Sequence, residues 1–225
     1  NNVFYGKLRD ATSNCVMYIA ASQYDINVSH NTFIIDTGAS PARIIYGTGC
    51  CTTRMIYVYN NIFVNLGNGP CLNWSSQANI TAYYRGDGNI FFRPGATPVV
   101  VGWIGSNPST GTPCDLPTWQ AAAAGYDTAS KVADPLLLSL TAPDIRFAPS
   151  SPAKDAAAPY LAAPSYPLFD VAEDHFGTPR GTLRDIGAYE LPGSGFFPFG
   201  AGCMGSGSFV PAIGHTGTVA IGSAN

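Results

Sequence analysis

The sequence predicts an all-β fold in which short parallel strands stack into a solenoid. Three observations lead to this prediction. An Asn-x-Phe motif recurs about every 29 residues, the segments around it alternate apolar and polar residues, and the chain of 225 residues contains 25 Gly and 18 Pro. Only 11% of the residues are charged and 46% are hydrophobic, so the chain can bury a core but lacks the composition of a helical bundle.

The repeat is marked by asparagines that each stand two residues before a phenylalanine. The successive asparagines are 29, 30 and 28 residues apart, and the pairs are Asn2 and Phe4, Asn31 and Phe33, Asn61 and Phe63, and Asn89 and Phe91. A fixed period of this length is typical of solenoids, in which each repeat forms one coil. The strands of an antiparallel sandwich have no reason to repeat at a fixed period, so parallel stacking is favoured.

Strands are predicted on both sides of the motif. Residues 26–30 and 56–60 alternate apolar and polar side chains, which indicates strands with one buried face. Further β-rich runs lie between the motifs, at residues 15–20, 42–46, 71–74 and 99–104. Each repeat is therefore expected to hold two or three short strands separated by Gly, Pro, Asn and Ser turns, and the chain about four coils.

Stacking of the coils places like residues above one another at a spacing of about 4.8 Å. The four phenylalanines are then expected to form an internal stack. The four asparagines are expected to form a ladder at a bend, where each side-chain amide bonds to its neighbours while the asparagine tolerates left-handed backbone geometry. These asparagines and phenylalanines are therefore predicted to have a structural role in the solenoid.

Several segments resemble the coil signature of right-handed parallel β-helix proteins, the architecture of pectate-lyase-like enzymes. In the coils these are residues 26–33 (INVSHNTF), 56–63 (IYVYNNIF) and 86–92 (GDGNIFF). Downstream, Ser151–Asp155, Asp174–Arg180 and Asp185–Glu190 are similar to the closing segment of secreted bacterial β-helix proteins, although Lys154 and Ala157 replace its usual apolar residue and glycine. The resemblance covers roughly residues 1–190, and it implies a right-handed parallel β-helix.

Three parts of the chain are expected. Residues 1–133 are assigned to coils with one short helix near residues 116–124, residues 134–190 to an irregular cap over the open end of the stack, and residues 191–225 to a Gly/Ser-rich linker and the start of a second module. Asp115 or Leu116 is expected to begin the helix and Gly125 to end it. Trp119 is interpreted as a packing anchor in preference to a platform that stacks on a sugar. Because the chain opens within a repeat and shows no signal peptide, we expect further coils upstream.

Composition excludes several classes of protein. A net charge of −3 without a basic cluster argues against nucleic-acid binding, and no apolar run is long enough to span a membrane. Six cysteines without metal-ligand spacing, together with few lysines, suit a secreted or cell-surface protein with disulfides; buried free thiols are the alternative. No metal site is predicted, and we expect a monomer.

The polar residues of the predicted strands suggest a binding face. Alignment of the coils on the asparagines places Asn27, Tyr57 and Arg85 in one outward column, and Ser29, Tyr59 and Asp87 in the next. His30 lies beside them, just before the bend. Aromatic rings stack on sugars, and Arg and Asp bond to their hydroxyls or carboxylates, so this face is a candidate glycan groove; an ordinary polar solenoid face is the alternative.

The resemblance implies a secreted or cell-surface protein that acts on a polysaccharide and has its main site on upstream coils. A lyase is favoured over a hydrolase. A lyase would require Ca²⁺ or arginine to neutralise the substrate carboxylate. A non-catalytic adhesive or glycan-binding module is the alternative function. Asp174, Arg180, Arg184, Asp185 and Glu190 could form a catalytic cluster, but their place in the closing segment favours a structural network.

Overall fold

The computed structural model describes residues 1–8, 15–19, 25–38, 42–47, 55–96, 99–105, 111–141, 144–159 and 171–192. Asn1–Leu191 form one compact unit, to which the following description applies. The predicted linker and second module at residues 191–225 lie outside the described residues, except for Leu191 and Pro192. No helix among the described segments is long and apolar enough to cross a bilayer.

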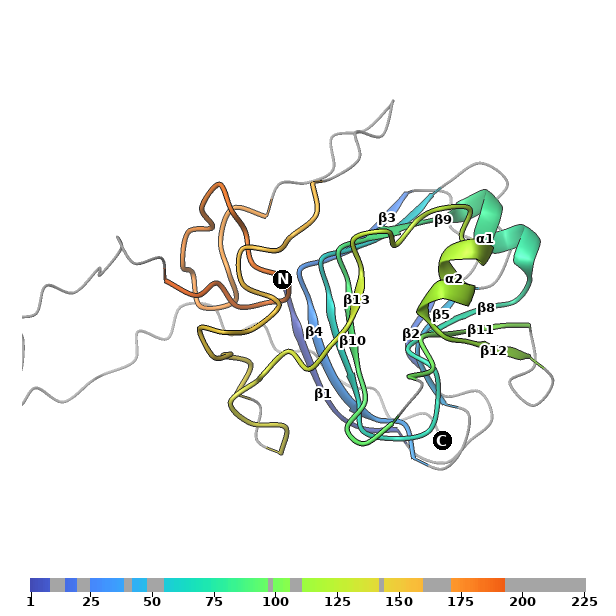
Figure 1. Cartoon of the computed structure of the whole chain (residues 1–225), viewed down its shortest axis with the longest axis horizontal. Helices are drawn as coiled ribbons and strands as arrows, with labels where there is room; N and C mark the ends of the chain where they lie inside the picture. The colour runs from blue at the N-terminus through green and yellow to red at the C-terminus, as the bar shows by residue number, and fades with distance from the viewer. Residues whose placement is uncertain are drawn as a thin grey trace, which may run out of the picture. The chain divides into compact units, whose positions relative to one another are not determined.

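The chain winds through three sheets in turn (Figure 1). The first sheet contains β1 (Val3–Lys7), β4 (Thr32–Asp36), β7 (Ile62–Asn65), β10 (Ile90–Phe92) and β13 (Lys131–Val132). The second sheet contains β2 (Cys15–Ile19), β5 (Arg43–Gly47), β8 (Leu72–Trp74), β11 (Gly102–Ile104) and β12 (Thr112–Cys114). The third sheet contains β3 (Ile26–Ser29), β6 (Ile56–Tyr59) and β9 (Tyr84–Asp87). All pairings are parallel except β11–β12, so the predicted parallel β-helix is confirmed.

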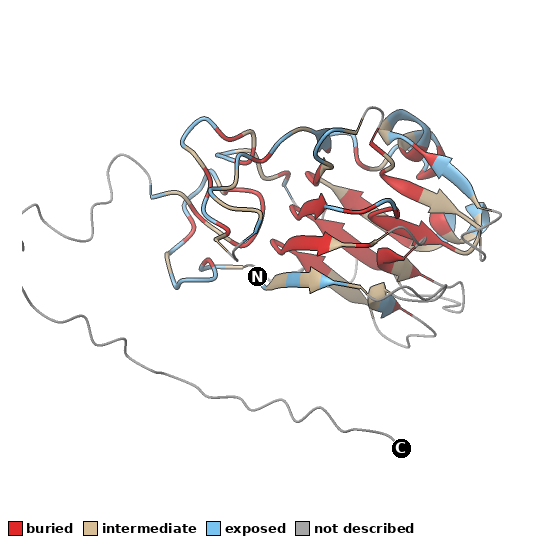
Figure 2. Ribbon diagram, turned by 90° about the horizontal axis from the view of Figure 1, so that it is seen from below, coloured by how far each residue is buried: buried red, intermediate tan, exposed pale blue. Residues whose placement is uncertain are grey.

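The phenylalanines of the repeat form the expected internal stack. Phe4 pairs in register with Phe33, Phe33 with Phe63, and Phe63 with Phe91. The centroids of the four successive rings are separated by 4.6, 5.0 and 5.3 Å, and neighbouring rings lie within 8° of parallel. Most strand residues of these coils are buried (Figure 2), so the stack forms the centre of the core.

The asparagines form a hydrogen-bonded ladder next to the phenylalanine stack. The side-chain oxygen of Asn61 accepts from the backbone N–H and the side-chain amide of Asn31, both at 3.0 Å. Asn89 accepts from Asn61 in the same way, and Asn31 from Asn2. The ladder therefore satisfies the backbone donor that each bend would otherwise leave unpaired in the interior.

The left-handed backbone lies one residue earlier than the sequence predicted. His30, Asn60 and Gly88 have φ values of 51°, 56° and 65°, whereas the ladder asparagines after them are not among the residues with positive φ. A ladder asparagine needs extended geometry so that its N–H faces the next coil. The sharp change of direction thus falls on the preceding residue, for which glycine and asparagine are well suited.

Two short helices lie beside the ends of β8 and β9 (Figure 1). The predicted helix is α2 (Leu116–Ala122), and the Asp115 carboxylate caps it by accepting from the N–H of Thr118 at 3.0 Å. The other helix, α1 (Gln77–Tyr83), was not predicted. It is only seven residues long, which is too short to show the apolar periodicity of a helix. It also contains β-branched residues, which have a lower helix propensity.

The buried carboxylate of Asp127 joins α2 to the coils. One of its oxygens accepts from the hydroxyl of Tyr84 at 2.6 Å and from the indole N–H of Trp119 at 2.9 Å. The other accepts from Ser130 at 2.6 Å and from the last ladder residue, Asn89, at 3.0 Å. Trp119 is fully buried against Trp74 and Tyr84, which supports its interpretation as a packing anchor.

The cap lies along the side of the stack and not over its end. Ile145, Phe147, Ile186 and Ala188 pack against apolar side chains of β4, β7 and β10, which form the outer face of the first sheet. Figure 1 shows residues 175–191 beside β1 and β4. The position differs from the predicted one because the outer face of the first sheet is itself apolar. This face requires a cover, and the cap provides it.

The charged residues of the closing segment bind one another and the backbone. Arg180 donates to Glu190 at 2.8 Å and to the carbonyl of Gly187 at 2.7 Å, and its side chain is fully buried. The Asp174 carboxylate accepts from the N–H groups of Phe176, Thr178 and Glu190. The arrangement is a network that holds the turns of the cap, as its position in the sequence favoured.

Gly187 should be essential for docking of the cap. Its φ is +94°, and a methyl group here would lie 2.6 Å from Cδ1 of Ile62 and 3.0 Å from the hydroxyl of Thr32. We expect Gly187→Ala to destabilise the cap by about 1–3 kcal/mol, and amide hydrogen exchange should accelerate in residues 171–191. Gly177→Ala is the control, because its φ is +80° but nothing lies within 4 Å of the added methyl. Equal effects of the two substitutions would show that the contact with Ile62 is unimportant.

Three cysteines can be assessed. Cys15, Cys71 and Cys114 are free thiols, and burial raises the pKa of Cys71 to about 12. For these three residues the expectation of disulfides is wrong, because Cys71 and Cys114 serve as small apolar residues of the core. Cys50, Cys51 and Cys203 lie outside the described residues.

Candidate functional site

The predicted outward columns exist in the third sheet with the predicted register. Asn27 pairs with Tyr57 and Tyr57 with Arg85, while Ser29 pairs with Tyr59 and Tyr59 with Asp87. The intervening Val28 and Val58 pack in the core, which places the columns on the outer face of the sheet. Alignment on the asparagines was therefore sufficient to bring these residues together.

The third sheet is nevertheless well covered. Tyr57 and Tyr59 are 6% and 0% exposed, whereas Asn27, Arg85 and Asp87 are half-buried. The segment after α2 binds this face: the Arg85 guanidinium lies 4.8 Å from the ring centroid of Tyr126, and Asp87 accepts from the N–H of Ala129 at 2.7 Å. These contacts leave little aromatic surface for a ligand.

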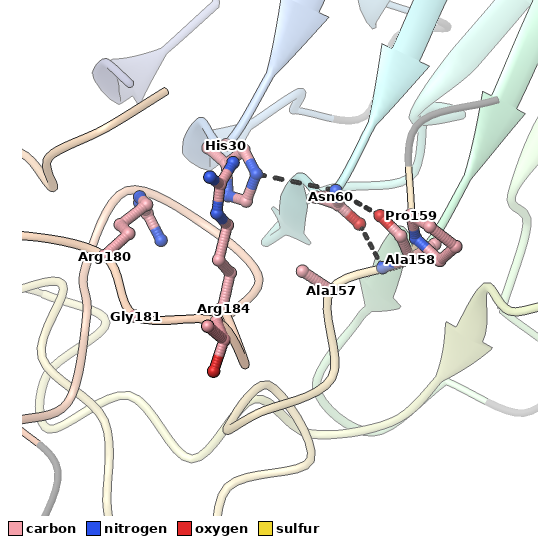
Figure 3. Close-up of a pocket in the computed structure, with 9 residues that line it drawn as sticks. His30, Asn60, Ala157, Ala158, Pro159, Arg180, Gly181 and Arg184 are labelled. Atoms are coloured by element: carbon pink, nitrogen blue, oxygen red, sulfur yellow. Dashed lines mark hydrogen bonds between the residues drawn. The ribbon is translucent and has the colours of Figure 1, made fainter. Parts of the chain in front are cut away.

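The two tyrosines and the histidine predicted for this face are unsuited to proton transfer near neutral pH. Burial raises the pKa of the Tyr57 and Tyr59 hydroxyls, so both stay protonated. Burial and the nearby Arg180 lower the pKa of His30 to about 3, so its imidazole stays neutral. His30 faces the cap, with Nδ1 3.1 Å from the carbonyl of Asp185 and Nε2 3.5 Å from the side-chain nitrogen of Asn60 (Figure 3).

An aromatic strip on the second sheet is a stronger candidate for a binding face. It contains Tyr18, Tyr46, Asn73 and Trp103, which are in register from β2 to β11, together with Arg43. Ile45 and Leu72 alternate with the strip and pack in the core, so the strip lies on the outer face of the sheet. Ile44 is also in the core, which shows that β5 departs from strict alternation and leaves Arg43 and Tyr46 on the same face.

The strip is held by a chain of contacts along the helix axis. The rings of Tyr18 and Tyr46 are 5.4 Å apart and tilted by 34°. The Arg43 guanidinium lies 4.0 Å from the centroid of Tyr46 and donates to the side-chain oxygen of Asn73. The amide of Asn73 in turn donates to the carbonyls of Trp103 at 2.9 Å and Gly105 at 3.1 Å.

Exposure is concentrated at one end of the strip. Tyr18 is 59% exposed and Tyr46 and Trp103 are half-buried, whereas Arg43 is 2% exposed. The sequence predicts strands in these segments, but the segments carry no Asn-x-Phe marker by which their residues could be aligned. The spacing of 28 residues between Tyr18 and Tyr46, which is one coil, was the signal that could have revealed the strip.

Comparison of the chain with protein-family models, curated proteins and solved structures gave no match. Among the described residues, no three His, Cys, Asp or Glu side chains gather as a metal site would require.

Proposed function

We propose that the chain is a glycan-binding β-helix module, which takes an extended polysaccharide on the aromatic strip of the second sheet. The observation that carries the proposal is the exposed ring of Tyr18 on a fixed support of Tyr46, Arg43 and Asn73. The resemblance to secreted, pectate-lyase-like β-helix proteins supports the same class of ligand. The proposal concerns binding alone.

The support matters because binding is weakened by the entropy lost when a side chain is immobilised. Tyr18 rests on Tyr46, and Arg43 of the same strand as Tyr46 fixes the Tyr46 ring, so the Tyr18 ring is already oriented before a ligand arrives. A tyrosine ring offers an apolar face to the C–H groups of a sugar, and its hydroxyl offers a hydrogen bond. Tyr46 and Trp103 place further aromatic rings in the same column on later coils, which suits a polymer more than a single sugar.

The proposal can be tested by affinity electrophoresis of the chain in gels that contain neutral or acidic polysaccharides. Tyr18→Ala should weaken retention on the bound polysaccharide by roughly 3- to 10-fold, because the contact of one aromatic ring is lost. Tyr5→Ala is the matched control: Tyr5 belongs to the same coil and is 47% exposed, but it lies on β1 of the first sheet.

A further variant distinguishes the second sheet from the third sheet as the binding face. Replacement of Arg85 by Ala alters the third sheet and should leave retention unchanged, because Arg85 is stacked on Tyr126. No retention on any polysaccharide would reject the proposed function. Retention that is sensitive to Arg85→Ala but not to Tyr18→Ala would move the site to the third sheet.

A further inference from the structure

A cleft of about 720 Å³ lies where the bends of the first coils meet the cap. His30 and Asn60 form its wall on the coil side, and residues 157–159, 180–182 and 184 form the rest (Figure 3). Its volume is within the range of small-molecule sites. The cleft is independent of the aromatic strip, which belongs to the second sheet.

The lining of the cleft is positively charged. Arg180, Arg184 and Thr182 are among the residues that line the cleft, and no acidic residue is, although the Arg180 side chain itself has no exposed surface. Glu190 binds Arg180 but does not line the cleft. Ala157, Ala158 and Pro159 form an apolar side, so one part of the cleft is polar and cationic and the other excludes water.

Arg180 is held rigidly at the base of this site. Its terminal nitrogens donate to Glu190 and to the carbonyls of Asp185 and Gly187, and its side chain has no exposed surface. Its Nε is buried without a hydrogen-bond acceptor among the described residues. An unmet cationic donor in a buried position is unfavourable, and a bound anion in the cleft would lower its cost.

The neighbouring imidazole does not add to this charge. His30 is fully buried, hydrogen-bonds to the Asp185 carbonyl and is neutral. Asn60 is also committed, since its side chain donates to the carbonyl of Ala158 at 3.0 Å and accepts from the N–H of Ala158 at 2.7 Å. The coil side of the cleft is thus a fixed neutral wall. The positive charge of the cleft comes from Arg184, with Arg180 paired to Glu190 beneath.

We propose that the cleft binds a small ligand that bears an oxyanion, with Arg184 and the Thr182 hydroxyl as its contacts and Arg180 as the buried charge beneath. The planar guanidinium matches the paired oxygens of a carboxylate, a sulfate or a phosphate group. The apolar side made by Ala157, Ala158 and Pro159 accommodates the carbon skeleton to which that group is attached.

The test is a titration of the ¹⁵N-labelled whole chain with sodium sulfate, phosphate or acetate, followed by NMR at constant ionic strength. We expect saturable shifts of the amide signals of Gly181, Thr182 and Arg184, with a dissociation constant on the order of 1 mM. Saturation by sulfate or phosphate alone assigns a tetrahedral group, and saturation by acetate assigns a carboxylate. Higher ionic strength should weaken binding, because the contact is electrostatic.

Arg184→Gln should weaken the anion at least tenfold. Arg146→Gln is the matched control, since Arg146 is an exposed arginine of the cap that pairs with Asp144 and does not line the cleft. Thr182→Val, at an exposed position, provides a second variant that should weaken binding without disturbing the fold. Shifts that never saturate, or equal affinity in wild type, Arg184→Gln and Thr182→Val, would overturn the proposal.

Discussion

Asn61→Ala is expected to lower the free energy of unfolding by about 3–5 kcal/mol, one of the two largest effects of a single substitution in the coils. Asn61 is fully buried, and its oxygen accepts from both the backbone and the side chain of Asn31. Its amide donates to the carbonyl of Val28 at 2.8 Å and to Asn89 at 3.0 Å. Alanine removes these four hydrogen bonds in an interior that water does not reach. Asn89 still accepts from the backbone N–H of residue 61, but both donors of Asn31 and the carbonyl of Val28 lose this partner.

Urea unfolding followed by circular dichroism measures this loss. Asn2→Ala is the control, because Asn2 is at the exposed end of the same ladder and its side chain contributes only one donor, at 3.2 Å from Asn31. The control should change stability by less than about 1 kcal/mol. If Asn61→Ala were as stable as Asn2→Ala, the ladder would be incidental to the fold.

Asp127→Asn is expected to destabilise the protein by about 2–4 kcal/mol. An amide can replace the oxygen that accepts from Ser130 and Asn89, but its NH₂ group then faces the indole N–H of Trp119. The indole nitrogen is a donor only, so it cannot reverse its role, whereas the Tyr84 hydroxyl can. A double-mutant cycle with Trp119→Phe should recover much of the loss, and additive effects would contradict this explanation.

The same residue should contribute a pH dependence. Burial raises the pKa of Asp127 above the ordinary aspartate value of 3.8, despite hydrogen bonds that act in the opposite direction. The folded state therefore holds the proton more tightly than the unfolded chain. The stability that this supplies is present below about pH 4 and is lost as the pH rises through the raised pKa. Unfolding at several pH values should show the advantage of wild type over Asp127→Asn shrink as pH increases.

The repeated part of the fold could be predicted because each coil carries the same marker residues. An asparagine that must pair with the coils on both sides, followed by an inward phenylalanine, fixes both register and direction. The bend was placed one residue too late, since sequence shows that asparagine is required but not which of two adjacent residues takes the left-handed conformation. The ladder residue cannot do so, because its N–H must point along the axis.

Features that occur once in the chain were harder to predict. Docking of the cap depends on unrepeated contacts between distant residues, such as Asn60 with Ala158 and Thr32 with Ala188. The register of the columns on the third sheet was predicted, but their burial was not. They are covered by the segment Tyr126–Ala129, which follows α2 and lies outside the repeat. The aromatic strip was missed because its coils lack a marker residue on the second sheet.

In-register stacking also restricts how the length of this chain can change. A single residue inserted between Asn31 and Phe33 would displace the phenylalanine from its column and turn every following side chain of β4 to the opposite face. Removal of residues 31–60 would instead bring Asn61 and Phe63 directly onto Asn2 and Phe4. The coil is therefore the smallest unit that can be inserted or deleted within the strands without disturbing the ladder and the stack.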